Sequence, residues 1–199
     1  MTLPVGASIQ LVEPSLALLP GYAAALETGW SPNTGRDVSG EHLAAIRANA
    51  ADFICDLTRH EGGVATLKDG SQTPRLPGRI LWIWDGEFSG TINIRFVPGT
   101  EDLLPHVSGH VGYAVVPWKR NRGYARQALR LLLPIARDLG MRRVLITCDE
   151  DNVGSRRVVE AVGGEPAGTS FDPAYFEKRK LLFWISTDMP ARSDRPTTR

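Results

Sequence analysis

Residues 110–125 read HVGYAVVPWKRNRGYA. The apolar run predicts a strand over His110–Val116 that ends at Pro117. The apolar spacing after the basic loop predicts a helix over Gly123–Leu139, with Gly140 as its stop. A helix that begins at a glycine directs free backbone N–H groups and the positive end of its dipole toward the loop. The stretch therefore predicts a site for phosphate or pyrophosphate.

The charge distribution supports a compact anionic ligand. Between Lys119 and Arg157 the sequence has ten basic and four acidic residues, although the net charge of the 199-residue chain is only +1. A basic zone within a nearly neutral chain favours a small anion over nucleic acid or an anionic membrane surface. We therefore expect neither a nucleic-acid partner nor a membrane partner.

Several further elements are predicted around this segment. After it come a buried strand, a helix opened by Asn152 or Ser155 and closed by Gly163-Gly164, and a last strand. Before it, the Asp85-Gly86 pair between two apolar runs predicts a hairpin. The predicted strands are Ile9–Val12, Arg79–Trp84, Phe88–Phe96, Val144–Cys148 and Lys180–Thr187.

The N-terminal part of the chain is predicted to be mainly helical. One helix over Ser15–Trp30 is expected to break or restart at Pro20-Gly21, and a second over Glu41–His60 is expected to have Ser39 as its N-cap. The polar segments Gly62–Gly78 and Val97–Ser108 are predicted to be connectors.

The sequence lacks two common phosphate-binding motifs and contains a third one in the basic loop. The patterns GxxxxGK[ST] and GxGxxG are absent, and Arg120-x-x-Gly123-x-Ala125 is present. This motif resembles the acetyl-CoA signature of the GNAT superfamily of N-acetyltransferases, [Q/R]-x-x-G-x-[G/A]. The order of strand, loop, helix, strand and Asn152-x-x-Ser155 is also similar to that family over about Arg79–Glu165. The sequence further resembles a subgroup of predicted bacterial acetyltransferases.

The resemblance implies a fold. We expect one α/β (α+β) domain over residues 1–188, with a central, mixed but mostly antiparallel sheet of about seven strands and helices on both faces. The strands His110–Val116 and Val144–Cys148 are expected to splay apart and admit acetyl-CoA. Residues 189–199 are expected to form a disordered tail.

The resemblance also implies the binding residues. Backbone groups of Val115 and Val116 are expected to bind the pantetheine arm, which Asn152 also reaches with Ser155 and Arg156 nearby. The pyrophosphate is expected to bind at Arg120, Asn121, Arg122, Gly123, Tyr124 and Ala125. Helix capping is an alternative role for Asn152 and Ser155.

The implied reaction is direct attack of an amine on the thioester of acetyl-CoA, without a metal or a covalent enzyme intermediate. Many family members protonate the departing thiolate with a tyrosine, and Val159 stands at that position here. His110 and Cys148 are the candidate catalytic residues, with a structural histidine and a packed thiol as alternatives. A non-catalytic acyl-CoA-binding module is the alternative function.

The acceptor cannot be identified from the sequence, so a small-molecule amine and a protein amine both remain open. Homodimers are common in the family that the sequence resembles, so a second copy of the chain is one candidate partner. The N-terminal residues Met1–Gln10 lack the features of a signal peptide, and no apolar run has the length of a membrane span, so we expect a cytoplasmic protein.

Overall fold

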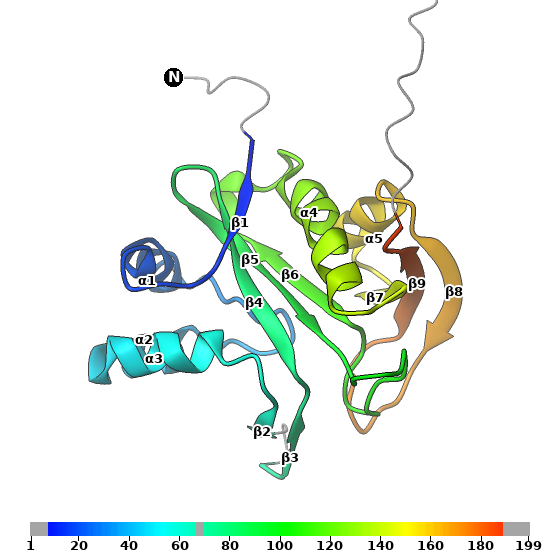
Figure 1. Ribbon diagram of the computed structural model, residues 1–199, viewed down its shortest axis with the longest axis horizontal. Helices are drawn as coiled ribbons and strands as arrows, with labels where there is room; N and C mark the ends of the chain where they lie inside the picture. The colour runs from blue at the N-terminus through cyan, green and yellow to red at the C-terminus, as the bar shows by residue number, and fades with distance from the viewer. Residues whose placement is uncertain (1–7, 67–69, 189–199) are drawn as a thin grey trace, which may run out of the picture.

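A seven-stranded sheet forms the centre of the computed structural model, which describes residues 8–66 and 70–188 (Figure 1). The strands of this sheet are β1 (Gln10–Val12), β4 (Gly78–Trp84), β5 (Phe88–Arg95), β6 (Val111–Val115), β7 (Arg143–Asp149), β8 (Glu165–Ser170) and β9 (Lys180–Ser186). A separate two-stranded sheet contains β2 (Gly63–Thr66) and β3 (Gln72–Arg75).

The order of strands in the large sheet is β1-β4-β5-β6-β7-β9-β8. All neighbouring strands are antiparallel except β6 and β7, which are parallel. β5 and β6 pair over five positions, whereas β6 and β7 pair only at Val111 and Ile146. The predicted mixed sheet with two splayed central strands is therefore confirmed.

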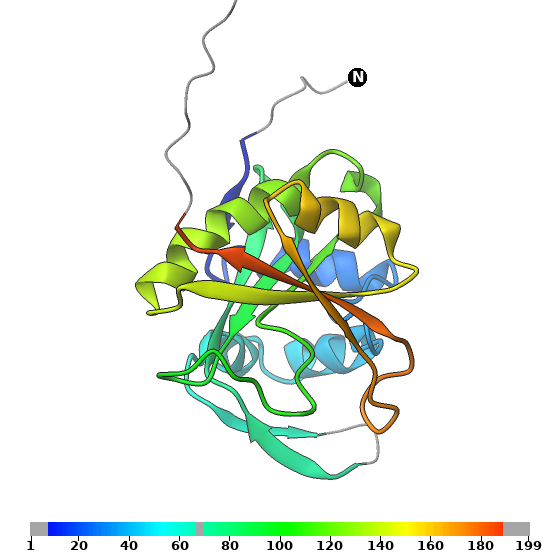
Figure 2. The same ribbon diagram turned by 90° about the vertical axis from the view of Figure 1, so that its right-hand side faces the viewer.

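Helices cover both faces of the sheet, as Figures 1 and 2 show. On one face are α1 (Leu19–Glu27), α2 (Ser39–Ala48) and α3 (Ala50–Thr58), which pack with an aromatic core around Trp82 and Phe88. On the other are α4 (Tyr124–Asp138) and α5 (Val153–Glu160), which pack with an aliphatic core around Leu129 and Ile146. Alternating side chains of the strands supply both cores, because successive residues point to opposite faces.

The N-terminal helices differ from the prediction in three ways. The expected helix Glu41–His60 is two helices, because Asn49 is extended (φ −160°, ψ 103°) and its side chain accepts hydrogen bonds from the N–H groups of Ala51 and Asp52. Asn49 therefore caps α3 and ends α2. Ser39 is not the N-cap of α2 but its first residue. The helix expected over Ser15–Trp30 is shorter, Leu19–Glu27, and begins next to Pro20, where a restart was expected, because a missing N–H costs nothing in the first turn.

Two strand predictions also needed correction. The segment expected to be a plain connector, Gly62–Gly78, contains the hairpin of β2 and β3. The strand β8 was not predicted, since every residue in it is exposed and its sequence lacks the apolar alternation of a half-buried strand. The predicted tail 189–199 lies outside the described residues. Within the described ranges, no helix combines the length and apolarity required to cross a membrane.

Candidate active site

The opening between β6 and β7 exposes backbone groups of β6. The carbonyl of His110 accepts from Arg95 N–H and the N–H of Val116 donates to the carbonyl of Ser89 (3.1 Å), so Gly112 and Ala114 between them also bond to β5. The exception is the N–H of His110, just before β6, which donates to Leu145 on β7 (2.8 Å). The N–H and C=O groups of the odd-numbered residues consequently face β7. Beyond Val111, β6 and β7 are no longer paired, so the N–H and C=O groups of Tyr113 and Val115 point into the opening.

This alternation changes one expectation. Val115 has the orientation needed to pair with an extended ligand, whereas the N–H of Val116 is already used within the sheet. Tyr113, which the sequence did not single out for its backbone, has its N–H and C=O groups on the same edge of β6 as those of Val115. The alternation of backbone groups along a strand would have identified Tyr113, but only if the strands on the two sides of β6 had been known.

The N-terminus of α4 lies directly beyond β6 and has the features of an anion site. Gly123 is its N-cap in the left-handed conformation (φ 81°), no side chain caps the helix, and its first turn holds no acidic residue. Asn121 is also left-handed, with φ of 60°. The first-turn N–H groups of a helix have no intrahelical acceptor, so those that follow Gly123 point into the loop. The geometry fits a pyrophosphate at this loop.

A buried cluster holds this loop in place. The Nζ atom of Lys119 donates to Asp85 Oδ1 (2.7 Å) and to Ser89 Oγ (3.2 Å), and the hydroxyl of Tyr124 donates to Asp85 Oδ2 (2.5 Å). The side chains of Lys119 and Asp85 are only 6% and 7% exposed. Burial alone would raise the pKa of Asp85, but hydrogen bonds from Lys119 and Tyr124 outweigh it and hold that pKa below its usual value. Tyr124 therefore contributes its backbone, not its hydroxyl, to the loop surface.

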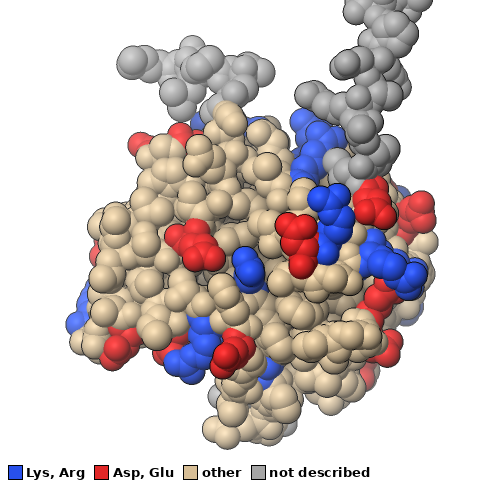
Figure 3. Space-filling view, in the orientation of Figure 1, with Lys and Arg blue, Asp and Glu red and all other residues tan. Residues whose placement is uncertain are grey.

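The arginines of the loop are free to meet a ligand. Arg120 and Arg122 are exposed, and Nε of Arg120 donates to the carbonyl of Val115 (3.1 Å). Arg120 thus occupies a backbone acceptor that an extended ligand would also use, so its side chain has to move when such a ligand binds. On the face drawn in Figure 3, basic and acidic side chains are interspersed rather than gathered into one broad basic surface.

The start of α5 forms the other wall of the opening. Asn152 is the N-cap of α5, and its Oδ1 accepts from Ser155 N–H (3.0 Å). The Ser155 hydroxyl lies 2.8 Å from the hydroxyl of Tyr113 on β6, so the pair bridges the two walls. Arg156 is exposed and pairs with Glu160 one helical turn away. Asn152 therefore has the capping role that was expected as an alternative, whereas Ser155 contributes the capped N–H.

His110 is a fully buried residue that links β6 to β7. Its Nδ1 accepts from Leu145 N–H (2.8 Å), and its Nε2 has no partner among the described residues. Burial, and then the nearby charge of Arg95, lower the pKa of His110 to about 4. These contacts suit a structural histidine, and a proton acceptor of such a low pKa is a weak base toward an ammonium ion.

Cys148 and Val159 both lie in the aliphatic core. Burial raises the pKa of the Cys148 thiol, which keeps it protonated, and the Val159 side chain is fully buried. The other cysteine, Cys55, is exposed rather than buried. Among residues 8–66 and 70–188 there is no group of three or more His, Cys, Asp or Glu side chains that would hold a metal ion.

Comparison with known families agrees with this geometry. The family model for the acetyltransferase (GNAT) domain matches residues 47–165, which is more than half of the chain. The chain belongs to the GNAT acetyltransferase family. The predicted family and fold are confirmed, and the matched range contains the whole site from Asp85 to Arg156. A search of curated protein sequences found no match.

Solved structures of other GNAT proteins share the fold. RimJ of Mycobacterium smegmatis, in complex with CoA-disulfide, is 21% identical, covers 89% of this chain and 81% of its own, and has a TM-score of 0.62. The Salmonella typhimurium enzyme that modifies the N-terminal serine of ribosomal protein L7/L12 is 15% identical, with a TM-score of 0.60 and coverage of 92% and 97%. The microcin C7 self-immunity acetyltransferase MccE, in complex with acetyl-CoA and AMP, is 15% identical, with a TM-score of 0.55 and coverage of 92% and 94%. At these identities the likeness shows the fold.

Proposed function

We propose that this GNAT protein transfers an acetyl group from acetyl-CoA to an amine by direct attack on the thioester. The observation that carries the proposal is the opening between β6 and β7 beyond Val111, which leads to the uncapped N-terminus of α4. An extended ligand with a pyrophosphate at one end fits both features. The structures of RimJ and MccE, which hold CoA-disulfide and acetyl-CoA, support this choice of ligand.

In this proposal, β6 and the start of α4 bind different parts of acetyl-CoA. The loop and helix start from Arg120 to Ala125 bind the pyrophosphate, and the backbone of Val115 pairs with the pantetheine arm after Arg120 moves aside. The N–H of Tyr113 points into the opening and polarises the thioester carbonyl. A backbone donor of this kind contributes on the order of 3 kcal/mol to lowering the barrier.

The departing thiolate also has to be stabilised. Val159, which stands where many family members have a tyrosine, cannot do this. The paired hydroxyls of Tyr113 and Ser155 lie between the walls of the opening, 2.8 Å apart. We assign the thiolate contact to this pair. The predicted roles of His110 and Cys148 in proton transfer have less support, because one is a neutral buried imidazole and the other a buried thiol.

Thermal denaturation with acetyl-CoA tests the binding part of the proposal. A ligand at 100 times its Kd adds about 2.7 kcal/mol to the stability of the folded protein, which is a readily measured rise in Tm. Thiol release with a library of amines then tests turnover. No rise in Tm at saturating acetyl-CoA would refute the proposal, and a rise without turnover on any amine would favour the non-catalytic binding module.

A matched pair of glycines at the two ends of α4 localises the site. Gly123 and Gly140 both have left-handed φ angles, 81° and 85°. Alanine at either position costs a similar amount, roughly 1–2 kcal/mol, because a Cβ clashes in that conformation. Gly123→Ala is expected to weaken acetyl-CoA binding in addition, whereas Gly140→Ala is expected to leave affinity unchanged. Equal affinity in both variants would place the pyrophosphate elsewhere.

A further inference from the structure

Arg95, the last residue of β5, is a largely desolvated cation. Its Nε donates to the carbonyl of Gly109 (2.7 Å) and its Nη1 to Oδ1 of Asn93 (3.4 Å). A guanidinium has five N–H donors, and within the described residues the other three have no acceptor. Burial lowers the pKa of Arg95. Both of its partners are neutral amide oxygens, so its charge is not compensated by them.

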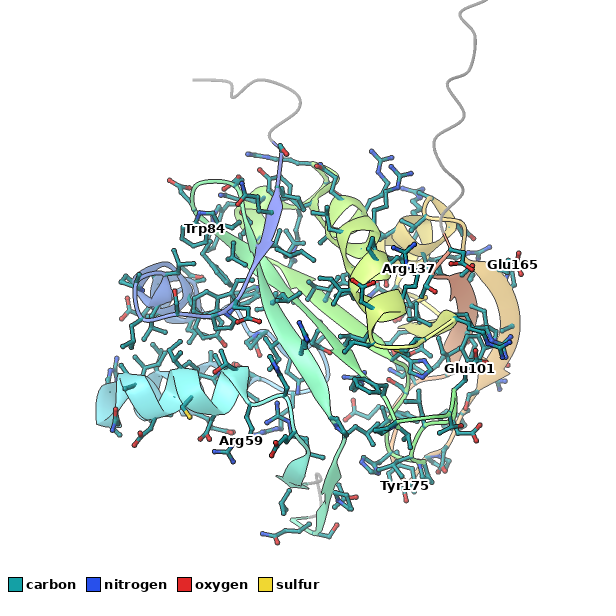
Figure 4. The ribbon with its side chains drawn as sticks, in the orientation of Figure 1. Arg59, Trp84, Glu101, Arg137, Glu165 and Tyr175 are labelled. Carbon is teal, nitrogen blue, oxygen red and sulfur yellow. The ribbon has the colours of Figure 1, made fainter. Side chains whose placement is uncertain are left out.

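Among the described residues, no acidic side chain forms an ion pair with Arg95. Glu101, on the loop that follows β5, pairs with Arg143 (2.7 Å) and Arg142 (3.8 Å). Figure 4 shows Glu101 with Tyr175 at the end of the sheet remote from α1. Desolvating a cation is costly unless an anion accompanies it. The three remaining N–H donors of Arg95 are therefore available to an anion from outside the described chain.

Arg95 and Asn93 lie on the face of the sheet opposite α4 and α5. Ile92 and Ile94 belong to the core beneath those helices, so the residues that alternate with them point the other way. Asn93 pairs with Gly112 on β6, and a Cβ on Gly112 would lie 3.3 Å from both amide atoms of Asn93. Gly112 precedes Tyr113, whose N–H faces the opening. The pair Arg95 and Asn93 is therefore one residue step from the proposed reaction point.

This part of the sheet is open to a ligand. Asn93, Arg95 and Gly112 each retain partial exposure, although they lie on the two central strands β5 and β6. In contrast, Thr91 and Ala114, the next residues on the same face, are buried against the aromatic core under α1–α3. The helices thus cover the face up to Thr91 and leave the two residues beyond it accessible.

We propose that Arg95 and Asn93 bind a carboxylate of the acceptor, so that the acceptor is an amine that carries a carboxylate close to the reacting nitrogen. This proposal rests on the acetyl transfer proposed above and names its acceptor class. A guanidinium binds a carboxylate through two parallel N–H···O bonds, and the Asn93 amide supplies a further donor. Free amino acids and peptides with an acidic residue next to the N-terminus share this chemistry, whereas polyamines lack it.

Turnover of matched amines by four proteins tests the proposal. The proteins are the unaltered chain, Arg95→Met, Arg95→Lys and the control Arg79→Met, which removes an arginine from the other face of neighbouring β4. One substrate series compares L-serine and L-alanine with serinamide and alaninamide. The other compares the peptides Ser-Asp-Ala-amide and Ser-Asn-Ala-amide. The series that shows the preference identifies the source of the carboxylate.

The expected result is a loss that depends on the substrate's charge. Removing one partner of a desolvated charge pair typically costs at least 2 kcal/mol, so Arg95→Met should lower kcat/KM about 30-fold or more for carboxylated amines. Its effect on the neutral partners should be small, Arg95→Lys should retain part of the activity, and Arg79→Met should match the unaltered chain. A purely structural Arg95 would lower kcat/KM equally for both members of each pair, which would overturn the proposal.

Calorimetry on the protein saturated with CoA separates this proposal from the acetyl transfer. L-serine or Ser-Asp-Ala-amide should bind the unaltered chain and not Arg95→Met, whether or not turnover occurs. Binding without turnover supports the carboxylate site and counts against the acetyl transfer. Turnover of neutral amines with no carboxylate-dependent binding refutes the carboxylate site alone. Thermal denaturation of each variant with acetyl-CoA confirms that the fold and the donor site are intact.

Discussion

In the proposed reaction, the pKa of the Tyr113 hydroxyl decides whether it can protonate the departing thiolate. Burial raises the pKa of its hydroxyl to about 12, despite the opposing hydrogen bond with Ser155. An alkyl thiol has a pKa near 8.5, so complete proton transfer from Tyr113 to a thiolate would be uphill by roughly 5 kcal/mol. The hydroxyl pair is therefore suited to donating a hydrogen bond to the thiolate, which water protonates after release.

Removing the Tyr113 hydroxyl is expected to slow the chemical step. Tyr113→Phe and Ser155→Ala should each lower kcat about 10- to 100-fold, because a hydrogen bond to a charged group contributes roughly 1.5–3 kcal/mol. The acetyl-CoA affinity, measured by calorimetry, should change little. Tyr175→Phe is the control, since that ring contacts Phe176 on its own loop between β8 and β9 and His106 on the loop between β5 and β6. An unchanged kcat in both variants would exclude the hydroxyl pair from the reaction.

His110 is expected to govern acid stability instead of catalysis. Its pKa is about 4 in the folded protein and near 6.5 in the unfolded chain, so only the unfolded state binds the proton between these values. The stabilisation is fully present above pH 6.5 and is lost as the pH falls toward 4. His110→Gln, whose side-chain oxygen can accept the Leu145 N–H, should show a smaller loss of unfolding free energy between pH 7 and pH 4.5 in urea titrations.

The same variant also distinguishes the two roles considered for His110. A structural histidine predicts that His110→Gln keeps most of its kcat at pH 8. Loss of kcat with normal acetyl-CoA affinity would instead support proton transfer by His110.

At the scale of elements, the hairpin of β4 and β5 fixes the loop that precedes α4. Asp85 stands in the turn of this hairpin and bonds both Lys119 and Tyr124, which lie on either side of the basic loop. The loop can therefore present its backbone in one conformation while Arg120 and Arg122 stay free. The buried Lys119 is therefore a positioning residue, which its place in a basic loop does not reveal.

Asp85→Asn is expected to destabilise the protein and weaken acetyl-CoA binding together. Breaking a buried ion pair typically costs about 3–5 kcal/mol. In Asp85→Asn the buried lysine keeps only Glu87 (3.4 Å), whose side chain is 82% exposed, as an ion-pair partner among the described residues. The pKa of Asp85 is lowered in the folded state, so its contribution is present above the unfolded pKa of 3.8 and is lost as the pH falls through the lower folded value. Urea titrations at pH 7 and pH 3 measure both effects.

The control for this prediction is Asp151→Asn, which removes a pair with Lys178 at the surface, where both side chains are more than half exposed. Its stability should be close to that of the unaltered chain. Equal stability of Asp85→Asn and Asp151→Asn would show that the buried cluster does not anchor the loop.

At the scale of the whole molecule, the sheet separates two cores with different tasks. The aliphatic core beneath α4 and α5 supports the donor site, and the aromatic core beneath α1–α3 covers part of the opposite face. The opening between β6 and β7 passes between these faces. A donor on one side and an acceptor on the other can therefore meet without sharing a pocket.

This division predicts that acetyl-CoA slows amide hydrogen exchange in some elements and not in others. The N–H groups of Tyr113, Val115 and the first turn of α4 have no partner in the sheet or helix, so they should exchange quickly without ligand and slowly with it. Amides of α1–α3 should change little. Mass spectrometry of deuterated peptides measures the difference, and equal protection across the described chain would contradict a localised donor site.

Several features were predictable because they depend on local sequence. Asp85-Gly86 between apolar runs gave the hairpin, Pro117 and Gly123 delimited the loop, and Asn152 gave the cap of α5. The break at Asn49 was missed, since the apolar spacing continues through it while one extended residue divides the helix. β8 was missed because pairing with β9, not burial, defines it.

The sequence by itself determined the family, the elements from β4 to α5 and the bounds of the basic loop, because turns, caps and apolar periodicity depend on neighbouring residues. Only the tertiary structure decided which backbone groups of β6 are free, that Lys119 is buried against Asp85, and that Tyr113 meets Ser155 across the opening. It also placed Arg95 on the carbonyl of Gly109, and Asn93 beside Gly112, with no counter-ion for Arg95 among the described residues. These contacts join residues 14 to 42 positions apart, and sheet pairing, which creates them, has no local signal in the chain.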